Sequence, residues 1–459
     1  MTKTKILLLG ILTFLAMLIL SVIFYKERTC FLDISYHLFS ILKDGSFAIQ
    51  NNRFGAFFTQ LFPLIGSKFG ISLKSIAIAY SISFVILPFL TFLTIHLSLK
   101  NSKISVVYLL FVALMTTHTF YWIQSELPQA MAFLFIFIAL LDNIVSANKS
   151  ASPNFWLFSS ILLFIVCFTH PLVLFALSFV ILYYYISFPT QRAIIKSAGL
   201  IYFSFYIIKS LFFKTTYDSQ AIGGIKNFVT LFPNYFTLQS NKNLLKYFIH
   251  DYYFIILSIA TTTYFYLKEQ QYQKCLLVVS FFLGYCLLIN VSYPNGADQF
   301  YLENQYLILS FIVALPFAYD ILPKIKNYYI PYGIISFVCL VFLFRIINTH
   351  HTYTNRLKWN QDLLSKTENL SNKKLIISSS KAPTDTLLMK WGSSYEFWLL
   401  STIETGNSRS IIIEEGKNEF DWTLPSNSAF VAKWGKFEYK ELNRKYFIFN
   451  DTSSYVKIQ

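Results

Sequence analysis

Long apolar runs recur along this chain and leave little room for a soluble fold. A helix needs about 20 mainly apolar residues to cross the hydrocarbon core of a bilayer. Candidate spans occupy residues 5–25, 74–98, 103–121, 127–146, 155–169, 171–188, 197–213, 249–267, 275–293, 304–322 and 330–348. Only 13% of the residues are charged, against about 25% in soluble domains. The sequence therefore predicts an α-helical polytopic membrane protein with about 11 transmembrane helices.

Two of these spans come from one apolar stretch, 155–188, that is interrupted by Thr169, His170 and Pro171. Because proline disfavours helix at the residue before it, two short helices joined by a tight turn are expected here. A single kinked helix is the alternative, and it would invert the orientation of every later span. The first span, 5–25, is too long for a typical signal peptide and lacks a cleavage site, so we expect it to remain as an anchor.

The distribution of basic residues predicts the orientation. With the N-terminus inside, the inner loops carry most of the Lys and Arg residues that flank spans, whereas the outer connections 122–126, 169–171 and 294–303 carry none. This asymmetry follows the positive-inside rule and places the C-terminus outside. Two long outer loops remain, 26–73 and 214–248. Apolar residues at helical spacing predict two amphipathic helices in the first loop, joined near residues 43–46.

The chain changes character after about residue 349. Residues 374–378 and 410–414 have the length and composition of strands, and 383–403 has a helical apolar pattern. We therefore expect two domains: a transmembrane domain at 1–348 that includes interfacial helices in the 26–73 loop, and a small extracytoplasmic α/β domain at 349–459.

Charge and cysteine content exclude several functions. The net charge is +15, but the basic residues are scattered between apolar runs, so no nucleic-acid partner is expected. Of the five cysteines, Cys30 alone falls in a loop, so no disulfide framework is predicted. No local pair such as His-x-x-x-His is present, so we assign no metal ligands and leave the cofactor open.

Ionisable residues gather on the predicted outer face. Asp33 follows the first span, and Glu126 precedes Pro128 at the start of a later one. Each has a simple structural explanation, since loops carry solvated charge and a carboxylate stabilises a helix N-terminus. The functional hypothesis is that both are catalytic, with a carboxylate removing a proton from an acceptor.

Further residues are candidates for binding a substrate. Arg53 and Lys209, and also Lys43, could hold a phosphate, because Arg offers a bidentate fork and Lys a point charge. A histidine at a helix end is more often structural, and tyrosines near the last outer turn suit an interfacial belt. The predicted substrate-binding set is Tyr36, His37, Arg53, His170, Lys209, Asp298 and Glu303.

Several of these residues stand in an order that resembles the polytopic glycosyltransferase C (GT-C) superfamily, which includes protein O-mannosyltransferases and aminoarabinose transferases. The matching segments are Leu32-Asp33-Ile34-Ser35-Tyr36-His37, Arg53-Phe54-Gly55, Leu61-Phe62-Pro63, Ser125-Glu126 and Thr169-His170-Pro171. The resemblance covers 1–348 in topology. It departs from the family where Ile34 and Ser35 replace a second acidic residue, and where His170 replaces Lys-Gly. These departures leave the use of a metal and the donor headgroup open.

The resemblance implies a membrane glycosyltransferase that moves a sugar from a polyprenyl-phosphate donor to a glycan, lipid or protein acceptor. The reaction would occur at the outer face of a bacterial inner (plasma) membrane, in contact with membrane lipid. A transporter or flippase for lipid-linked saccharides is one alternative, although it should carry ionisable groups near the bilayer midplane. A non-catalytic scaffold whose outer domain binds a partner is the other.

Overall fold

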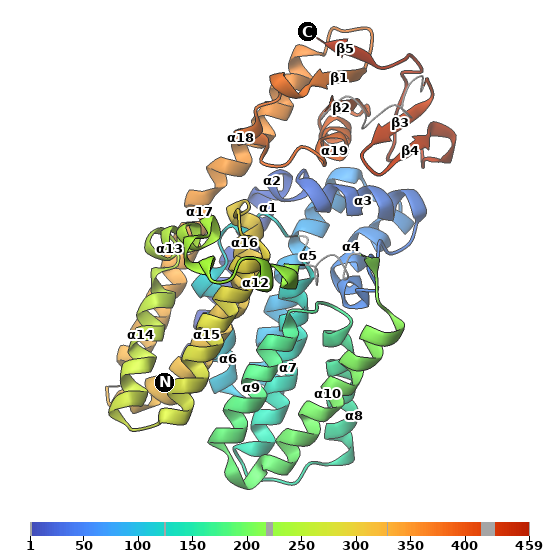
Figure 1. Ribbon diagram of the computed structural model, residues 1–459. Helices are drawn as coiled ribbons and strands as arrows, with labels where there is room; N and C mark the ends of the chain where they lie inside the picture. Colours follow the sequence, from blue (N-terminus) through green and yellow to red (C-terminus); the bar gives the residue numbers. More distant parts are fainter. Residues whose placement is uncertain (1, 124, 217–223, 328, 415–426, 459) are drawn as a thin grey trace.

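Roughly parallel helices form the body of the protein, with a smaller layer of strands at one end (Figure 1). The computed structural model describes residues 2–123, 125–216, 224–327, 329–414 and 427–458. The apolar helices are α1 (Lys3–Ile23), α5 (Leu73–Leu93), α6 (Ser102–Met115), α7 (Glu126–Val145), α8 (Pro153–Cys167), α9 (Val173–Ser187), α10 (Arg192–Phe212), α14 (Tyr253–Lys268), α15 (Tyr272–Ser292), α16 (Gln299–Pro316) and α17 (Tyr329–Lys366).

The helical body is that of a polytopic membrane protein. Within the described residues, seven helical segments are long and apolar enough to cross a membrane: Lys3–Ile23, Leu73–Ser98, Glu126–Val145, Pro189–Phe212, Tyr272–Ser292, Gln299–Lys324 and Tyr329–Lys366. The other four expected spans coincide with α6, α8, α9 and α14, which have 14, 15, 15 and 16 residues. These four are shorter than the roughly 20 residues that a straight span requires.

The apolar stretch around His170 is broken as the sequence predicts. Ser152 accepts a hydrogen bond from the Phe155 amide at the start of α8, and α8 ends at Cys167. Helix α9 then begins at Val173, two residues after Pro171. The break therefore leaves α8 and α9 as two separate short helices.

The first predicted outer loop is mostly helical. It holds α2 (Tyr25–Thr29), α3 (Leu32–Asp44), a short 3-10 turn η1 (Phe54–Ala56) and α4 (Phe57–Lys68). Helix α3 ends where Gly45 adopts a φ of 61° and donates its N–H to the Ile41 carbonyl, a left-handed cap that suits glycine. The two predicted helices and the joint near residues 43–46 are thus present.

The second outer loop contains α12 (Asn227–Thr230) and α13 (Gln239–His250), with short 3-10 turns before each, η5 (Gly224–Lys226) and η6 (Asn234–Thr237). Residues 217–223 of this loop lie outside the described part of the chain. Figure 1 shows α12 and α13 near the end of the bundle that also carries α2 and α3.

The C-terminal layer contains the two predicted strands at their predicted positions. A three-stranded sheet has the order β2-β1-β5, with β1 (Lys374–Ser378) pairing in parallel with both β2 (Ser410–Glu414) and β5 (Val456–Ile458). Strands β3 (Ala429–Ala432) and β4 (Gly435–Glu438) form an antiparallel hairpin. Helices α18 (Thr384–Leu387) and α19 (Ser393–Thr405) occupy the predicted helical region.

Helix α17 joins the bundle to the C-terminal layer without a break. Its 38 residues run through the boundary expected at 348–349, and Figure 1 shows the helix reaching from the bundle to the strands. The apolar side of α3 completes the connection, because Phe39 is fully buried among aromatic rings of the C-terminal layer. The rings nearest to it belong to Tyr395, Trp398, Phe430, Phe437 and Phe447. One hydrophobic core therefore extends from the helical body into the C-terminal layer.

Candidate functional site

Asp33 is the second residue of α3 and is partly buried. One of its carboxylate oxygens, Oδ2, accepts a hydrogen bond of 3.1 Å from Nε1 of Trp122. Burial raises the pKa of Asp33 from an ordinary 3.8 to about 6, and the negative charge of Glu126 adds to this. The hydrogen bond from Trp122 and the positive charge of Arg53 oppose the rise. The pKa of Asp33 therefore lies closer to neutral pH than that of an ordinary aspartate, which suits a proton acceptor.

Arg53 and Glu126 form an ion pair beside Asp33. Nη1 of Arg53 lies 2.7 Å from Oε2 of Glu126, and the two side chains are 11% and 13% exposed. Arg53 precedes η1, and Glu126 is the first residue of α7 after the Ser125 cap. Both charges act on Asp33, so the structure brings together the two predicted catalytic carboxylates and the predicted phosphate-binding arginine.

Tyr36 and His37 lie on the same side of α3 as Asp33, because residues three and four apart share a helix face. His37 is buried, and its Nδ1–H donates to the Ala48 carbonyl at 3.1 Å. Burial lowers the pKa of His37 to about 4, so the ring is neutral at physiological pH. The Tyr36 hydroxyl accepts a hydrogen bond from Nε2 of Gln50 at 3.2 Å.

The turn between α8 and α9 packs directly on η1. A Cβ placed on Gly55 would lie 1.7 Å from Oγ1 of Thr169, so only glycine permits this approach. Next to Thr169, Nδ1 of His170 accepts a hydrogen bond from the Leu172 amide at 3.2 Å. The pKa of His170 lies well below its usual value because of burial and the nearby charges of Arg53 and Lys209.

Lys209 belongs to the same group of side chains. It is buried on α10, and its Nζ donates to the Cys167 carbonyl at 2.8 Å. That carbonyl is at the C-terminal end of α8, where backbone acceptors lack helical partners. Six predicted site residues thus converge: Asp33, His37, Arg53, Glu126, His170 and Lys209. Lys43, by contrast, pairs with exposed Asp44 at the far end of α3.

Glu303 and Asp298 lie in a separate group on α16 and its cap. Glu303 is buried, and its carboxylate accepts hydrogen bonds from the amides of Thr117, His118 and Thr119 at 2.7 to 2.9 Å. The Tyr252 hydroxyl also donates to it. These bonds explain why a buried charge is tolerated here. Burial raises the pKa of Asp298, and the charge of Arg356 opposes the rise.

The segment that carries Trp122 is held from two sides. The Glu303 carboxylate accepts hydrogen bonds from the amides of residues 117–119 at the start of this segment. The buried guanidinium of Arg28 donates to the Phe120 carbonyl at 2.6 Å. Arg28 also donates to the Ser81 hydroxyl and carbonyl, each at 2.9 Å. Glu303 therefore contributes to the position of Trp122, and through it to the surroundings of Asp33.

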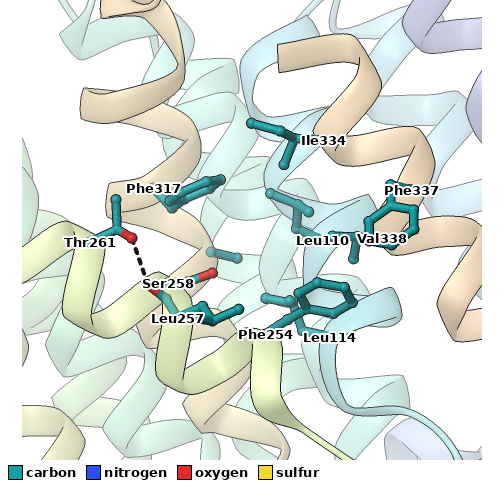
Figure 2. A pocket seen from close by; sticks show the side chains of 11 residues that line it. Leu110, Leu114, Phe254, Leu257, Ser258, Thr261, Phe317, Ile334, Phe337 and Val338 are labelled. Carbon is teal, nitrogen blue, oxygen red and sulfur yellow. Dashed lines mark hydrogen bonds between the residues drawn. The ribbon is translucent and has the colours of Figure 1, made fainter. Parts of the chain in front are cut away.

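The six converging residues, Asp33, His37, Arg53, Glu126, His170 and Lys209, are called the Asp33 group below. Two cavities lie away from this group. An apolar, partly open pocket of about 240 Å³ is lined mainly by side chains of α6, α14, α16 and α17, and Figure 2 shows the hydroxyls of Ser258 and Thr261 among its apolar walls. A second, polar cavity of about 490 Å³ is lined by residues 186–187 and 270–274. No predicted site residue lines either cavity. Both cavities therefore belong to other parts of the bundle.

The chemistry of the Asp33 group is that of a proton acceptor beside cations. Asp33 can take a proton near neutral pH, and Arg53 and Lys209 supply positive charge. A guanidinium carries five N–H donors, so Arg53 can donate to a phosphate oxygen while it remains paired with Glu126. Among the described residues, no group of three or more His, Cys, Asp or Glu side chains could hold a metal ion.

Sequence analysis missed three residues of this region. Trp122 was visible as an aromatic residue in the same short connection as Glu126. Arg28 stood in a run of three charged residues, 26–28, after the first span. Glu396, which accepts a hydrogen bond from the Leu32 amide, was visible as a single charge within an apolar segment, a pattern that indicates a buried and paired group. Their partners could not be identified without the fold.

Comparison of the chain with models of protein families, with curated proteins and with solved structures found no match.

Proposed function

We propose that this protein is a membrane glycosyltransferase that moves a sugar from a polyprenyl-phosphate donor to an acceptor at the extracytoplasmic face. The observation that carries the proposal is the Asp33 group: a carboxylate whose pKa is raised to about 6 stands beside an arginine–glutamate pair. The GT-C resemblance of residues 1–348 agrees with it. The acceptor is a hydroxyl-bearing glycan, lipid or protein.

The reaction assigns a role to each group. Asp33 accepts the proton of the acceptor hydroxyl while the oxygen bonds to the anomeric carbon of the sugar. The bond between that carbon and the phosphate oxygen breaks, and the polyprenyl phosphate leaves with the electron pair. Arg53 and Lys209 stabilise the negative charge of the phosphate. Glu126 holds Arg53 in place and acts on the proton affinity of Asp33.

The membrane arrangement is part of the proposal. Eleven spans with the N-terminus inside place the Asp33 group and the C-terminal layer on the outer face. Figure 1 supports this, because the N-terminus lies toward the opposite end of the bundle from the C-terminal strands. The four shorter helices then cross the membrane as partners of longer ones. Such a protein fits a bacterial inner membrane, where the donor and the site meet at the lipid surface.

The transporter alternative is weakened by where the buried carboxylates of the bundle lie. Asp142 is 16 residues after Glu126 on α7, which is about 24 Å at 1.5 Å per residue. It accepts hydrogen bonds from Asn101, Tyr184 and Tyr319. Asp320, in the turn that follows α16, is paired with Lys274. Both are satisfied at helix ends, whereas a transport pathway should carry ionisable groups near the midplane.

Transfer by the purified protein tests the proposal. A polyprenyl-phosphate sugar is supplied in detergent or vesicles, and release of the lipid phosphate is followed. Asp33→Asn should lower turnover by about 10²–10⁴-fold, the usual contribution of a general base. Asp44→Asn, a substitution of the same type at an exposed site on the same helix, should retain turnover. Full turnover by Asp33→Asn would remove Asp33 from the mechanism, and movement of intact donor across vesicles without transfer would replace the enzyme with a transporter.

A further inference from the structure

A buried ion pair contacts Leu32, the residue that precedes Asp33. Arg356 on α17 and Glu396 on α19 share two hydrogen bonds, Nε to Oε2 at 2.9 Å and Nη2 to Oε1 at 2.6 Å. Their side chains are 2% and 0% exposed. Oε1 of Glu396 also accepts a hydrogen bond of 2.7 Å from the amide of Leu32, the first residue of α3. The C-terminal part of α17, helix α19 of the C-terminal layer and the helix that carries Asp33 therefore meet at one carboxylate.

The backbone at Leu32 needs this support. Leu32 has a φ of 40°, a conformation that residues with a side chain rarely adopt. Such conformations persist only where the surroundings fix them. Gly392 supplies a second constraint, because a Cβ there would lie 2.8 Å from the Cα of Leu32. Glu396 also suits the place electrostatically, since a helix N-terminus has amides without helical partners and favours negative charge.

A buried ion pair is a poor source of stability, because desolvation of two charges offsets their attraction. Its value here is geometric. The two-point contact between Arg356 and Glu396 fixes the carboxylate, and the carboxylate fixes the first amide of α3. Lys26 and Glu404 offer a useful comparison. They form a 2.7 Å ion pair between α2 and the same α19, but their side chains are 27% and 23% exposed and they do not cap α3.

We propose that Glu396, held by Arg356, is a positioning residue that fixes the position of Asp33, so that the C-terminal layer contributes to the geometry of the site. The catalytic meaning of this role rests on the function proposed above. The mechanical link does not, because it follows from the contacts of Leu32. Displacement of the C-terminal layer should therefore move Asp33, whatever the substrate.

The indole of Trp122 provides a reporter that needs no turnover, because its Nε1–H donates to Asp33. The indole resonance is followed by ¹⁵N or ¹⁹F NMR in detergent and assigned by its loss in Trp122→Phe. In the wild type it should titrate with a midpoint of about 6. Glu126, Arg53 and His37 also face Asp33, so Asp33→Asn must remove the titration for it to be assigned to that carboxyl.

The test variant is Arg356→Met with Glu396→Leu, which removes both charges together and leaves neither buried alone. We expect the Trp122 resonance to shift and its midpoint to fall from about 6 toward the ordinary aspartate value of about 4, as α3 loosens and Asp33 gains water. Glu396→Gln keeps an acceptor for the Leu32 amide and should give an intermediate midpoint. Lys26→Met with Glu404→Leu is the matched control and should match the wild type.

An unchanged resonance and midpoint in the folded double variant would overturn the proposal. Should that variant fail to fold, Gly392→Ala presses on both Leu32 and the Glu396 carboxylate, because its Cβ would lie 2.8 Å from the Leu32 Cα and 2.9 Å from Oε1 of Glu396, while both charges remain in the chain. It should also shift the Trp122 resonance, and an unmoved resonance there would equally overturn the idea. A moved reporter in a protein that transfers no sugar from any donor would instead leave the positioning role standing and remove the proposed function.

Discussion

Asp33→Asn should stabilise the protein at neutral and alkaline pH, even though it removes the proposed base. The pKa of Asp33 is about 6 in the folded protein, against an ordinary value of 3.8. Folding therefore favours the protonated carboxyl, and the ionised form is a cost to the folded state. Well below pH 4 the Asp33 carboxyl is protonated in both the folded and the unfolded state, and the cost is absent. It grows as the pH rises and reaches its full size above pH 6.

The folded and unfolded pKa values of Asp33 differ by about two, and each unit of pKa corresponds to about 1.4 kcal/mol. Ionised Asp33 therefore lowers the free energy of unfolding by up to about 3 kcal/mol. Asparagine has the shape of aspartic acid, carries no charge and can still accept the Trp122 hydrogen bond. The variant should therefore be more stable than the wild type by up to about 3 kcal/mol at pH 8, and this difference should fall to about 0.5 kcal/mol at pH 4. A catalytic group that costs stability is a familiar exchange of stability for activity.

The measurement is denaturant or thermal unfolding in detergent micelles across pH 4 to 8, for the wild type, Asp33→Asn and Asp44→Asn. Asp44 is exposed on the same helix, so its substitution controls for the loss of one carboxylate. If Asp33→Asn had the same stability as the wild type at pH 8, or differed from it equally at pH 4 and pH 8, then burial does not disfavour the ionised form of Asp33.

Three further substitutions or fusions test other parts of the argument. Arg53→Ala should raise the KM for a polyprenyl-phosphate donor about tenfold or more, since a charge-assisted phosphate contact is lost; an unchanged KM would exclude Arg53 from donor binding. Gly55→Ala should lower the free energy of unfolding by about 1–3 kcal/mol, because its Cβ would lie 1.7 Å from Thr169 Oγ1, and Thr169→Ala in the same chain should restore part of that loss. A reporter fused after Gln459 should be active only outside the cytoplasm, and cytoplasmic activity would contradict the proposed orientation.

Local patterns in the sequence account for most of the secondary structure. Strand-length runs gave β1 and β2, and helical spacing gave α3, α4 and α19. The break between α8 and α9 follows from Pro171, because its effect on the preceding residue is steric and needs no other part of the chain. The boundary at 348–349 was inferred from a fall in hydrophobicity, which marks where apolar surroundings end. Helix α17 continues past this boundary because many polar residues are also good helix formers, so a fall in hydrophobicity does not by itself end a helix.

The sequence could also predict that Asp33, Arg53, Glu126 and His170 lie near one another at one end of the helical body, since helices that alternate in direction bring every second connection to the same end. Their partners were decided by the tertiary structure alone. Trp122 meets Asp33 across 89 residues, and Glu396 meets the Leu32 amide across 364. Periodicity reports which face of an element is buried but carries no information about the opposing element. The raised pKa of Asp33 depends on that same opposing protein, because it arises from the loss of water around the carboxylate.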